Sequence, residues 1–180
     1  DELHQKLTAR YMIRHTKAEV LKDLPPKSRR SMSVSLSDEY KKIYKRVAKD
    51  FLAWVKENGG AERVAKSMRA EALTQLTKLR SVSAMGKAEA AVDYIRNFFE
   101  GTGRPLVVMA VHREAIAMIT GGIDELNTAY EKAISKDQTH EINRPIRYGS
   151  VVGGQSASSR QAAIDAFQLR GELDVIIYSI

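Results

Sequence analysis

Three apolar segments separated by two helical patterns occupy the last hundred residues, and they limit the folds open to this chain. The segments lie at 105–111 (PLVVMAV), 146–152 and 174–180, and helical patterns fill the intervals over 113–133 and 156–169. The order strand, helix, strand, helix, strand is typical of an α/β domain with a parallel sheet and right-handed crossovers. The continuous apolar run of the first segment indicates a strand buried on both faces of that sheet.

The third apolar segment extends to the end of the chain. A buried parallel strand needs cover on both faces, so an end at Ser179-Ile180 favours a truncated domain. The alternative is an edge strand that closes a small complete domain.

Gly121-Gly122 predicts a loosening within the helix over 113–133.

The first part of the chain has a helical pattern interrupted by prolines. A helix is expected from Leu3 to Leu21, and Pro25-Pro26 prevents its continuation because proline lacks the amide donor. Residues 31–36 then alternate apolar side chains with serines, which predicts a half-buried strand.

Two amphipathic helices are expected to follow as a basic hairpin. Ser37-Asp38-Glu39 is a helix-start pattern, Asn58-Gly59-Gly60 ends the first helix, and the second reaches about Arg80. The expected inward positions are Tyr40, Ile43, Tyr44, Val47, Phe51 and Trp54, then Val64, Met68, Leu73, Leu76 and Leu79. Their three-to-four spacing favours a buried face over a base-stacking surface.

The balance of charge differs between the two parts of the chain. The net charge is +7; residues 1–80 carry 19 Lys and Arg against 10 Asp and Glu, and residues 81–180 carry 10 against 12. An anionic partner such as nucleic acid and a merely solvated lysine-rich surface are about equally compatible with this charge. No segment approaches the roughly 20 apolar residues of a membrane span, so no membrane partner is expected.

The sequence contains no self-sufficient catalytic motif. It lacks the phosphate-binding GxxxxGK[ST] pattern. It has no cysteine, and its four histidines show no metal-ligand spacing. Asp124-Glu125 lies in a helical pattern and is interpreted as surface, while Gly153-Gly154 suits either an anion seat at a helix start or a tight turn. We therefore assign no catalytic and no metal-binding residue.

Several segments resemble, in order, the motifs of the SWI/SNF family of helicase-like ATPases (superfamily-two helicases). The segment YMIRHTKAEVLKDLPPK resembles the link between the family's two motor lobes at Met12, Arg14, Lys17, Val20, Leu24, Pro25 and Lys27, with His15 replacing an Arg. The segment PLVVMAVHREAIAMI resembles the fourth helicase motif at Val107–Val111, His112 and Ile116. The run GGQSASSRQAAIDAFQ resembles a further motif at Gly153, Arg160, Gln161, Ile164, Phe167 and Gln168, and DVIIYSI resembles the start of the fifth motif.

This resemblance implies a fold and two domains. The fold class is α/β, a partial RecA-like parallel sheet with flanking helices, preceded by a mainly helical segment. Residues 1–83 are expected to form a basic helical linker and protrusion with one short strand. Residues 84–180 are expected to form a truncated second RecA-like helicase lobe, the C-terminal helicase lobe of the family.

The resemblance also implies a function, that of a DNA-dependent ATPase acting as a translocase. ATP and Mg²⁺ are the implied cofactors of the full-length protein, and double-stranded DNA and the missing first helicase lobe are the implied partners. Because the phosphate-binding loop belongs to that first lobe, this chain alone is expected not to hydrolyse ATP. The expected location is the nucleus in a eukaryote, or the cytoplasm in association with the nucleoid in a prokaryote or phage.

The implied DNA contacts lie where the loops of an open α/β sheet converge, at the carboxyl ends of its strands. The candidates there are His112, Arg113, Gly153, Gly154, Gln155, Ser156 and Ser179, with Gln155 standing where the family has Thr. Arg29 and Arg30, with Lys17 and Lys27, either bind DNA or brace the two lobes. Arg160 either contacts a phosphate or forms an ion pair with Asp165 or Glu114.

Two other functions are compatible with the sequence. A non-enzymatic basic nucleic-acid-binding module predicts salt-sensitive DNA binding without a larger parent protein. A regulatory domain with a receiver-like sheet predicts no DNA binding and needs an acidic cluster at its strand ends, which we do not find in the sequence.

Overall fold

The computed structural model describes residues 2–180 with several gaps. The gaps are Tyr11, Ile13, Arg14, 16–19, Lys22, 24–27 and 61–68, and the side chains of Leu3, His4, Thr8, Arg10 and Arg69 are also not described. Contacts divide the chain into two units, residues 1–33 and residues 34–180, each described by itself below. Predictions that lie outside the described residues concern Tyr11, Ile13, Arg14, Lys17, Leu24, Pro25, Lys27, Val64 and Met68.

The first unit contains helix α1, Glu2–Arg10. The helix is shorter than the predicted one, because Met12, His15 and Leu21 are not helical. Leu7 and Met12 are each more than a third exposed. Little apolar surface is therefore buried here, and tertiary packing supplies most of the stability of a helix in a protein.

A three-stranded parallel sheet organises the second unit. Its strands are β1 (Leu106–Ala110), β2 (Tyr148–Val151) and β3 (Val175–Ser179). Their order is β1-β3-β2, and both pairings are parallel, with Leu106 opposite Val175 and Tyr148 also opposite Val175. The predicted parallel α/β sheet is confirmed, and β3 is its central strand rather than an edge strand.

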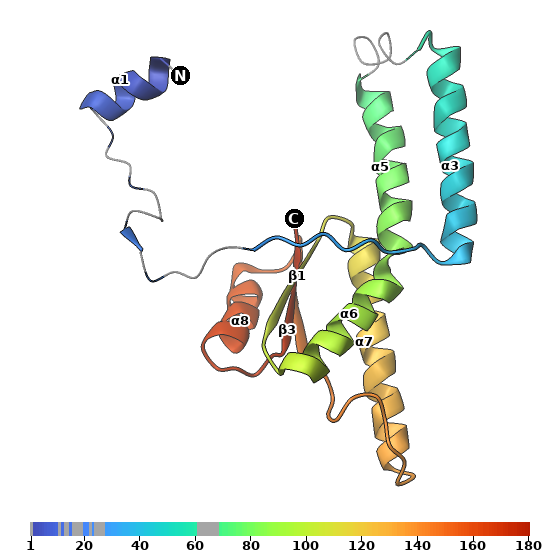
Figure 1. Cartoon of the computed structure of the whole chain (residues 1–180), viewed down its shortest axis with the longest axis vertical. Coiled ribbons are helices and arrows are strands. Elements are labelled where there is room, and N and C mark those ends of the chain that lie inside the picture. Colours follow the sequence, from blue (N-terminus) through green and yellow to red (C-terminus); the bar gives the residue numbers. More distant parts are fainter. Residues whose placement is uncertain are drawn as a thin grey trace. The chain divides into compact units, whose positions relative to one another are not determined.

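Helices lie on both faces of this sheet (Figure 1). Helices α6 (Ala88–Thr102) and α7 (Arg113–Ile134) pack on one face, and α8 (Ala157–Gln168) packs against β2 and β3 on the other. Gly103, at φ 60°, caps the end of α6, as expected for a glycine in the left-handed region.

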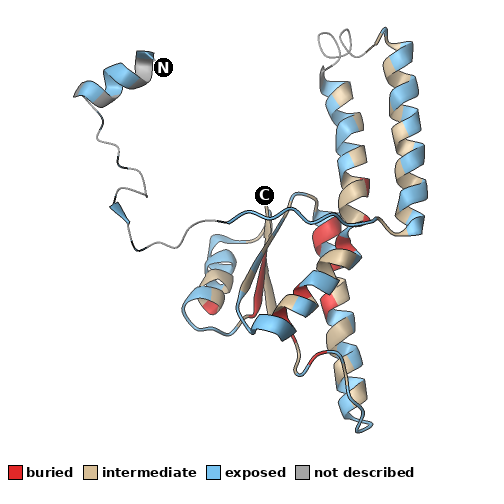
Figure 2. Ribbon diagram, in the orientation of Figure 1, coloured by how far each residue is buried: buried red, intermediate tan, exposed pale blue. Residues whose placement is uncertain are grey.

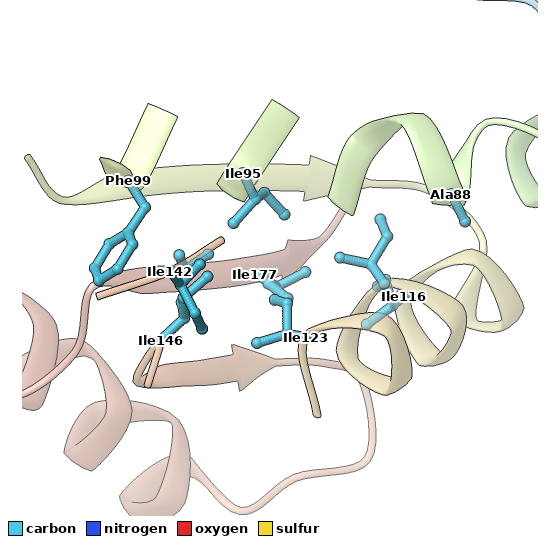
Figure 3. Close-up of a cluster of buried hydrophobic side chains, with 10 residues drawn as sticks. Ala88, Ile95, Phe99, Ile116, Ile123, Ile142, Ile146 and Ile177 are labelled. Carbon is cyan, nitrogen blue, oxygen red and sulfur yellow. The ribbon is translucent and has the colours of Figure 1, made fainter. Parts of the chain in front are cut away.

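The main core lies between the sheet and the pair α6–α7 (Figure 3). Ile95 and Phe99 of α6 meet Ile116 and Ile123 of α7 and Ile177 of β3, and Ile142 and Ile146 join them from the loop before β2. Each fully buried side chain of this size contributes roughly 1.5–3 kcal/mol to folding. This cluster therefore sets the position of the strand ends that carry the candidate site.

Strand β1 differs from the prediction of burial on both faces. Its residues alternate between half-buried and exposed, and Val107 and Met109 are 45% and 63% exposed (Figure 2). Val107 and Met109 pair with Ile176 and Tyr178 of β3. Helix α8 covers that face only over β2 and β3. The apolar run in the sequence therefore predicted more burial of β1 than the structure has.

The helical hairpin is present, but its interior is less buried than predicted. It consists of α3 (Asp38–Glu57) and α5 (Arg69–Met85), which pack side by side (Figure 1). Trp54 stacks near Phe51 at 6.3 Å between ring centroids, and its Nε1 donates to Glu71 Oε1 at 3.2 Å. Leu73 is 59% exposed and Leu76 is 37% exposed, so the prediction that both face inward was wrong.

Two further predictions were wrong. Residues 31–36 form no strand, and Met32 is 61% exposed; alternation of residue types cannot make a strand without a partner strand. Helix α7 runs through Gly121-Gly122 without interruption. A Cβ atom at Gly122 would lie 2.7 Å from Val92 Cγ2, so this glycine allows α6 and α7 to approach closely.

The boundary predicted between residues 83 and 84 stays a prediction. It falls within α5, which continues to Met85 and contacts α7. Gly86 follows α5, and a Cβ atom added at this glycine would lie 2.7 Å from Cβ of Tyr40.

Candidate nucleic-acid interface

The carboxyl ends of the three strands meet at one edge of the sheet. Ala110 is paired with Ser179, and the Ile180 amide donates to the Ala110 carbonyl at 3.1 Å. Because β2 is parallel to β3, the turn that follows Val151 leaves the sheet at this same edge. The loops β1–α7 and β2–α8 therefore leave the same edge on either side of β3, the edge at which ligands bind in open α/β sheets.

Arg113 joins these two loops. It is the first residue of α7, and its Nη2 donates to the Gly153 carbonyl at 2.6 Å. A Cβ atom at Gly153 would lie 3.0 Å from the same nitrogen, and Gly154 has φ 92°. Gly154 is therefore favoured by the left-handed turn, and Gly153 leaves room for the guanidinium of Arg113.

Gln155 and Ser156 shape the start of α8. The Gln155 side chain accepts from the Val152 amide at 3.0 Å and donates to the Ser150 carbonyl at 3.1 Å. Ser156 is the N-cap, and its hydroxyl accepts from the Ser159 amide at 3.1 Å. The two side chains hold the loop in shape, so their backbone and not their side chains is the part of them best placed to meet a ligand.

Arg160 is an exposed cation one turn into α8. The ion pair expected with Asp165 or Glu114 is not formed: Asp165 Oδ1 accepts instead from Gln161 Nε2 at 2.8 Å. No side-chain partner of Arg160 is found among the described residues. Such an arginine near a helix start is available for a phosphate.

The remaining candidates fall into two groups. His112 is the half-buried N-cap residue of α7, and Ser179 is the half-buried last residue of β3, so both lie at the strand-end edge. Arg29 and Arg30 are exposed but belong to the other unit. The structure therefore brings together the strand-end residues, and DNA contact by Arg29 and Arg30 stays a prediction.

A buried ion-pair cluster at the opposite end of the strands was missed by the sequence interpretation. Asp174, 8% exposed, precedes β3 and accepts from Arg144 Nη1 and Nη2, both at 2.8 Å, and from the Arg147 amide at 2.9 Å and Nη2 at 3.0 Å. Burial acts to raise the pKa of Asp174, but the hydrogen bonds from the two arginines outweigh it and hold that pKa well below its usual range. The signal in the sequence was an aspartate directly before the apolar run Val175–Ile177, since a buried carboxylate requires partners.

Other titratable groups give no metal site. No group of three or more His, Asp or Glu residues is arranged to hold a metal within the described ranges. Asp124 is exposed on α7, as predicted, and its carboxylate accepts from the Tyr148 hydroxyl at 2.9 and 3.0 Å. Burial, helped by this hydrogen bond, raises the pKa of Tyr148.

No helix among the described residues is long and apolar enough to cross a membrane.

A small parallel sheet with helices on both faces and loops gathered at one edge defines a RecA-like α/β lobe. The chain resembles the Sulfolobus solfataricus SWI2/SNF2 ATPase C-terminal domain, with a TM-score of 0.54 and 16% identity over 81% of this chain and 60% of that one. At this level of identity the likeness shows the fold. The predicted fold class is confirmed.

Sequence comparisons show similarity to helicase-like proteins. Residues 1–85 match the SNF2-related domain. The whole chain is 28% identical to the human DNA annealing helicase and endonuclease ZRANB3 and 24% identical to an uncharacterized ATP-dependent helicase of Mycoplasma genitalium. It spans 14% and 16% of the lengths of these two relatives. The domain match and the relatives therefore make the chain similar in sequence to SWI/SNF-type, helicase-like proteins.

Proposed function

We propose that this chain serves as part of the C-terminal lobe of an ATP-dependent DNA translocase of SWI/SNF type. In the full-length protein it grips the DNA backbone and provides half of the ATP cleft, and the first lobe of the same polypeptide provides the other half. The named relatives, which are much longer helicases, support this role. The protein then acts in the nucleus of a eukaryote, or at the nucleoid of a prokaryote or phage.

The contact from Arg113 to Gly153 carries the proposal. It fastens the β1–α7 and β2–α8 loops to each other at the carboxyl edge. The loops then present Arg160, the exposed Gly153 and Gly154, and the start of α8 on one surface. Phosphate contacts of this kind position a protein on nucleic acid without reading the sequence.

Mg²⁺ enters the proposal only with ATP in the full-length protein. Among the described residues there is no group that fits a metal ion, and the sequence lacks a phosphate-binding loop. We therefore assign no Mg²⁺ ligand and no catalytic step to this chain, and expect it to be inactive alone.

The two ends of α8 provide a matched test. Arg160→Gln removes a cation at the strand-end edge, and Arg170→Gln removes one that follows the other end of α8, where Arg170 pairs with Glu172 at 2.9 Å. We expect Arg160→Gln to weaken duplex DNA binding about three- to tenfold and to reduce the slope of log affinity against log salt by about one. Arg170→Gln is expected to change neither quantity. Equal losses in the two variants, or none in Arg160→Gln, would contradict the proposed interface.

The basic hairpin favours a second candidate function, that of a nucleic-acid-binding module acting without ATP. Lys42, Lys45, Arg46, Lys49 and Lys56 of α3 are exposed and have no side-chain partner among the described residues. In that case a Lys45→Gln/Lys49→Gln variant loses DNA affinity and Arg160→Gln does not. The same binding assay therefore separates the two functions.

A further inference from the structure

A cavity of about 560 Å³ adjoins the candidate interface. It lies between the end of α5, the carboxyl end of β1 and the beginning of α7. Met109 and Val111, each 63% exposed, supply its accessible apolar surface, and Arg80, Lys87 and His112 supply its polar side chains. An apolar interior with a few polar groups, at a volume within roughly 300–1,000 Å³, is typical of small-ligand sites.

The charge of this cavity has one sign. Arg80, Ser83 and Lys87 recur at helical spacing along one side of the end of α5 and its following turn, and none of the lining residues is acidic. A groove of similar size between α6 and α7, about 620 Å³, is lined by Glu89, Asp93 and Glu125 and by no cation. An anion is therefore favoured in the first cavity and repelled from the second.

The polar side chains of the cavity have no partner within the described part of the protein. The side chains of Arg80, Lys87 and His112 form no ion pair or hydrogen bond with any other described residue. By contrast, Arg144 and Arg147 are both occupied by Asp174. Guanidinium and ammonium groups without a carboxylate partner are suited to bind phosphate.

We propose that this cavity binds a nucleotide unit, with its base against Met109 and Val111 and its phosphate between Arg80, Lys87 and His112. The unit is either a free nucleotide or one nucleotide of a bound strand, since both present the same chemistry. The inference rests on the proposed function, because His112 belongs to both sites and the cavity extends the strand-end interface toward α5.

The test is a titration of the 180-residue chain followed by the amide resonances of Ser83, Ala110 and Ala115. The probes are adenosine monophosphate and a short single-stranded oligonucleotide. We expect saturable shifts at these residues with at least one probe, and at least fivefold weaker binding of that probe by Arg80→Met/Lys87→Met. Saturation by the mononucleotide identifies a free nucleotide as the source, and saturation by the oligonucleotide alone identifies a strand.

Lys132→Met/Lys136→Met is the matched control, because it removes two exposed cations at the far end of α7. An equal loss of affinity in this control, or no saturable shift with either probe, would overturn the proposed cavity site. Duplex binding by Arg160→Gln is measured in parallel. If neither probe binds the cavity but Arg160→Gln weakens duplex binding, the cavity site is refuted and the proposed function stands. If a probe binds the cavity but Arg160→Gln leaves duplex binding unchanged, the proposed function alone is refuted.

Discussion

Asp174 shows how a single buried carboxylate ties three sequence-distant segments to each other. It receives hydrogen bonds from Arg144 and Arg147, and the Arg144 guanidinium also lies 4.5 Å from the ring centroid of Phe99. The cluster stands at the start of β2 and β3, opposite the candidate interface. It therefore helps to align the starts of the two strands.

Asp174→Asn is expected to lower the free energy of unfolding by about 2–4 kcal/mol. The substitution leaves two arginines without a carboxylate, and their half-exposed positions keep the cost below that of a fully buried pair. Urea denaturation measures the loss, with the exposed Glu131→Gln as control. A change of less than about 0.5 kcal/mol, the range of ordinary surface substitutions, would show that the cluster is not stabilising.

The lowered pKa of Asp174 predicts a pH dependence of stability. The folded chain binds this proton more weakly than the unfolded chain, in which an aspartate has a pKa of about 3.9. The stabilisation is therefore complete above about pH 5 and is lost as the pH falls below about 4. The difference in unfolding free energy between the wild type and Asp174→Asn should stay constant from pH 5 to 8 and shrink on acidification. A difference that grows below pH 4 would refute this assignment.

At the scale of elements, the contact between α6 and α7 depends on one glycine of a pair. Gly122→Ala places a methyl group 2.7 Å from Val92 Cγ2, and the β-branched valine has little freedom to move. We expect a loss of about 1–2 kcal/mol in unfolding free energy. Gly121→Ala is the matched control, because its added methyl meets no other part of the fold within 4 Å. This control should gain about 0.5–1 kcal/mol, and equal effects of the two substitutions would contradict the close approach.

The sequence predicted the elements that have strong local patterns. All three strands were predicted with boundaries within two residues of those observed, and α8 begins one residue after its expected start. The predictions that were wrong concern burial and pairing. Val107, Met109, Leu73 and Leu76 have apolar side chains, but whether another element covers them is decided by parts of the fold that local periodicity does not report.

The candidate site was predictable in position but not in its contacts. The parallel strands predicted from the sequence place His112, Gly153 and Ser179 at one edge of the sheet, and the observed strand order agrees with this. The roles of Gln155, which holds its own loop, and Arg113, which fastens two loops, depend on side-chain directions. The cavity beside α5 was also not predicted, because Arg80, Lys87 and His112 come from different elements.

For the whole molecule, we expect that the purified chain does not hydrolyse ATP. The charge stabilisation needed for phosphoryl transfer comes largely from groups that this sequence lacks, including the phosphate-binding loop. Phosphate release by the chain with DNA and Mg²⁺ should equal the rate without protein. Any DNA-stimulated ATPase activity that copurifies with the chain and scales with its concentration would contradict the two-lobe requirement.

The most direct test of the central claim is a site-specific cross-link to DNA. The chain has no cysteine, so a single introduced thiol carries a photoreactive group at one known place. Ser158→Cys lies at the start of α8 on the strand-end edge, and Glu172→Cys lies in the exposed turn before β3 at the opposite edge. Labelled Ser158→Cys should cross-link duplex DNA in a salt-sensitive manner and labelled Glu172→Cys should not. Equal cross-linking from both positions, or cross-linking from Glu172→Cys alone, would contradict a DNA interface at the carboxyl ends of the strands.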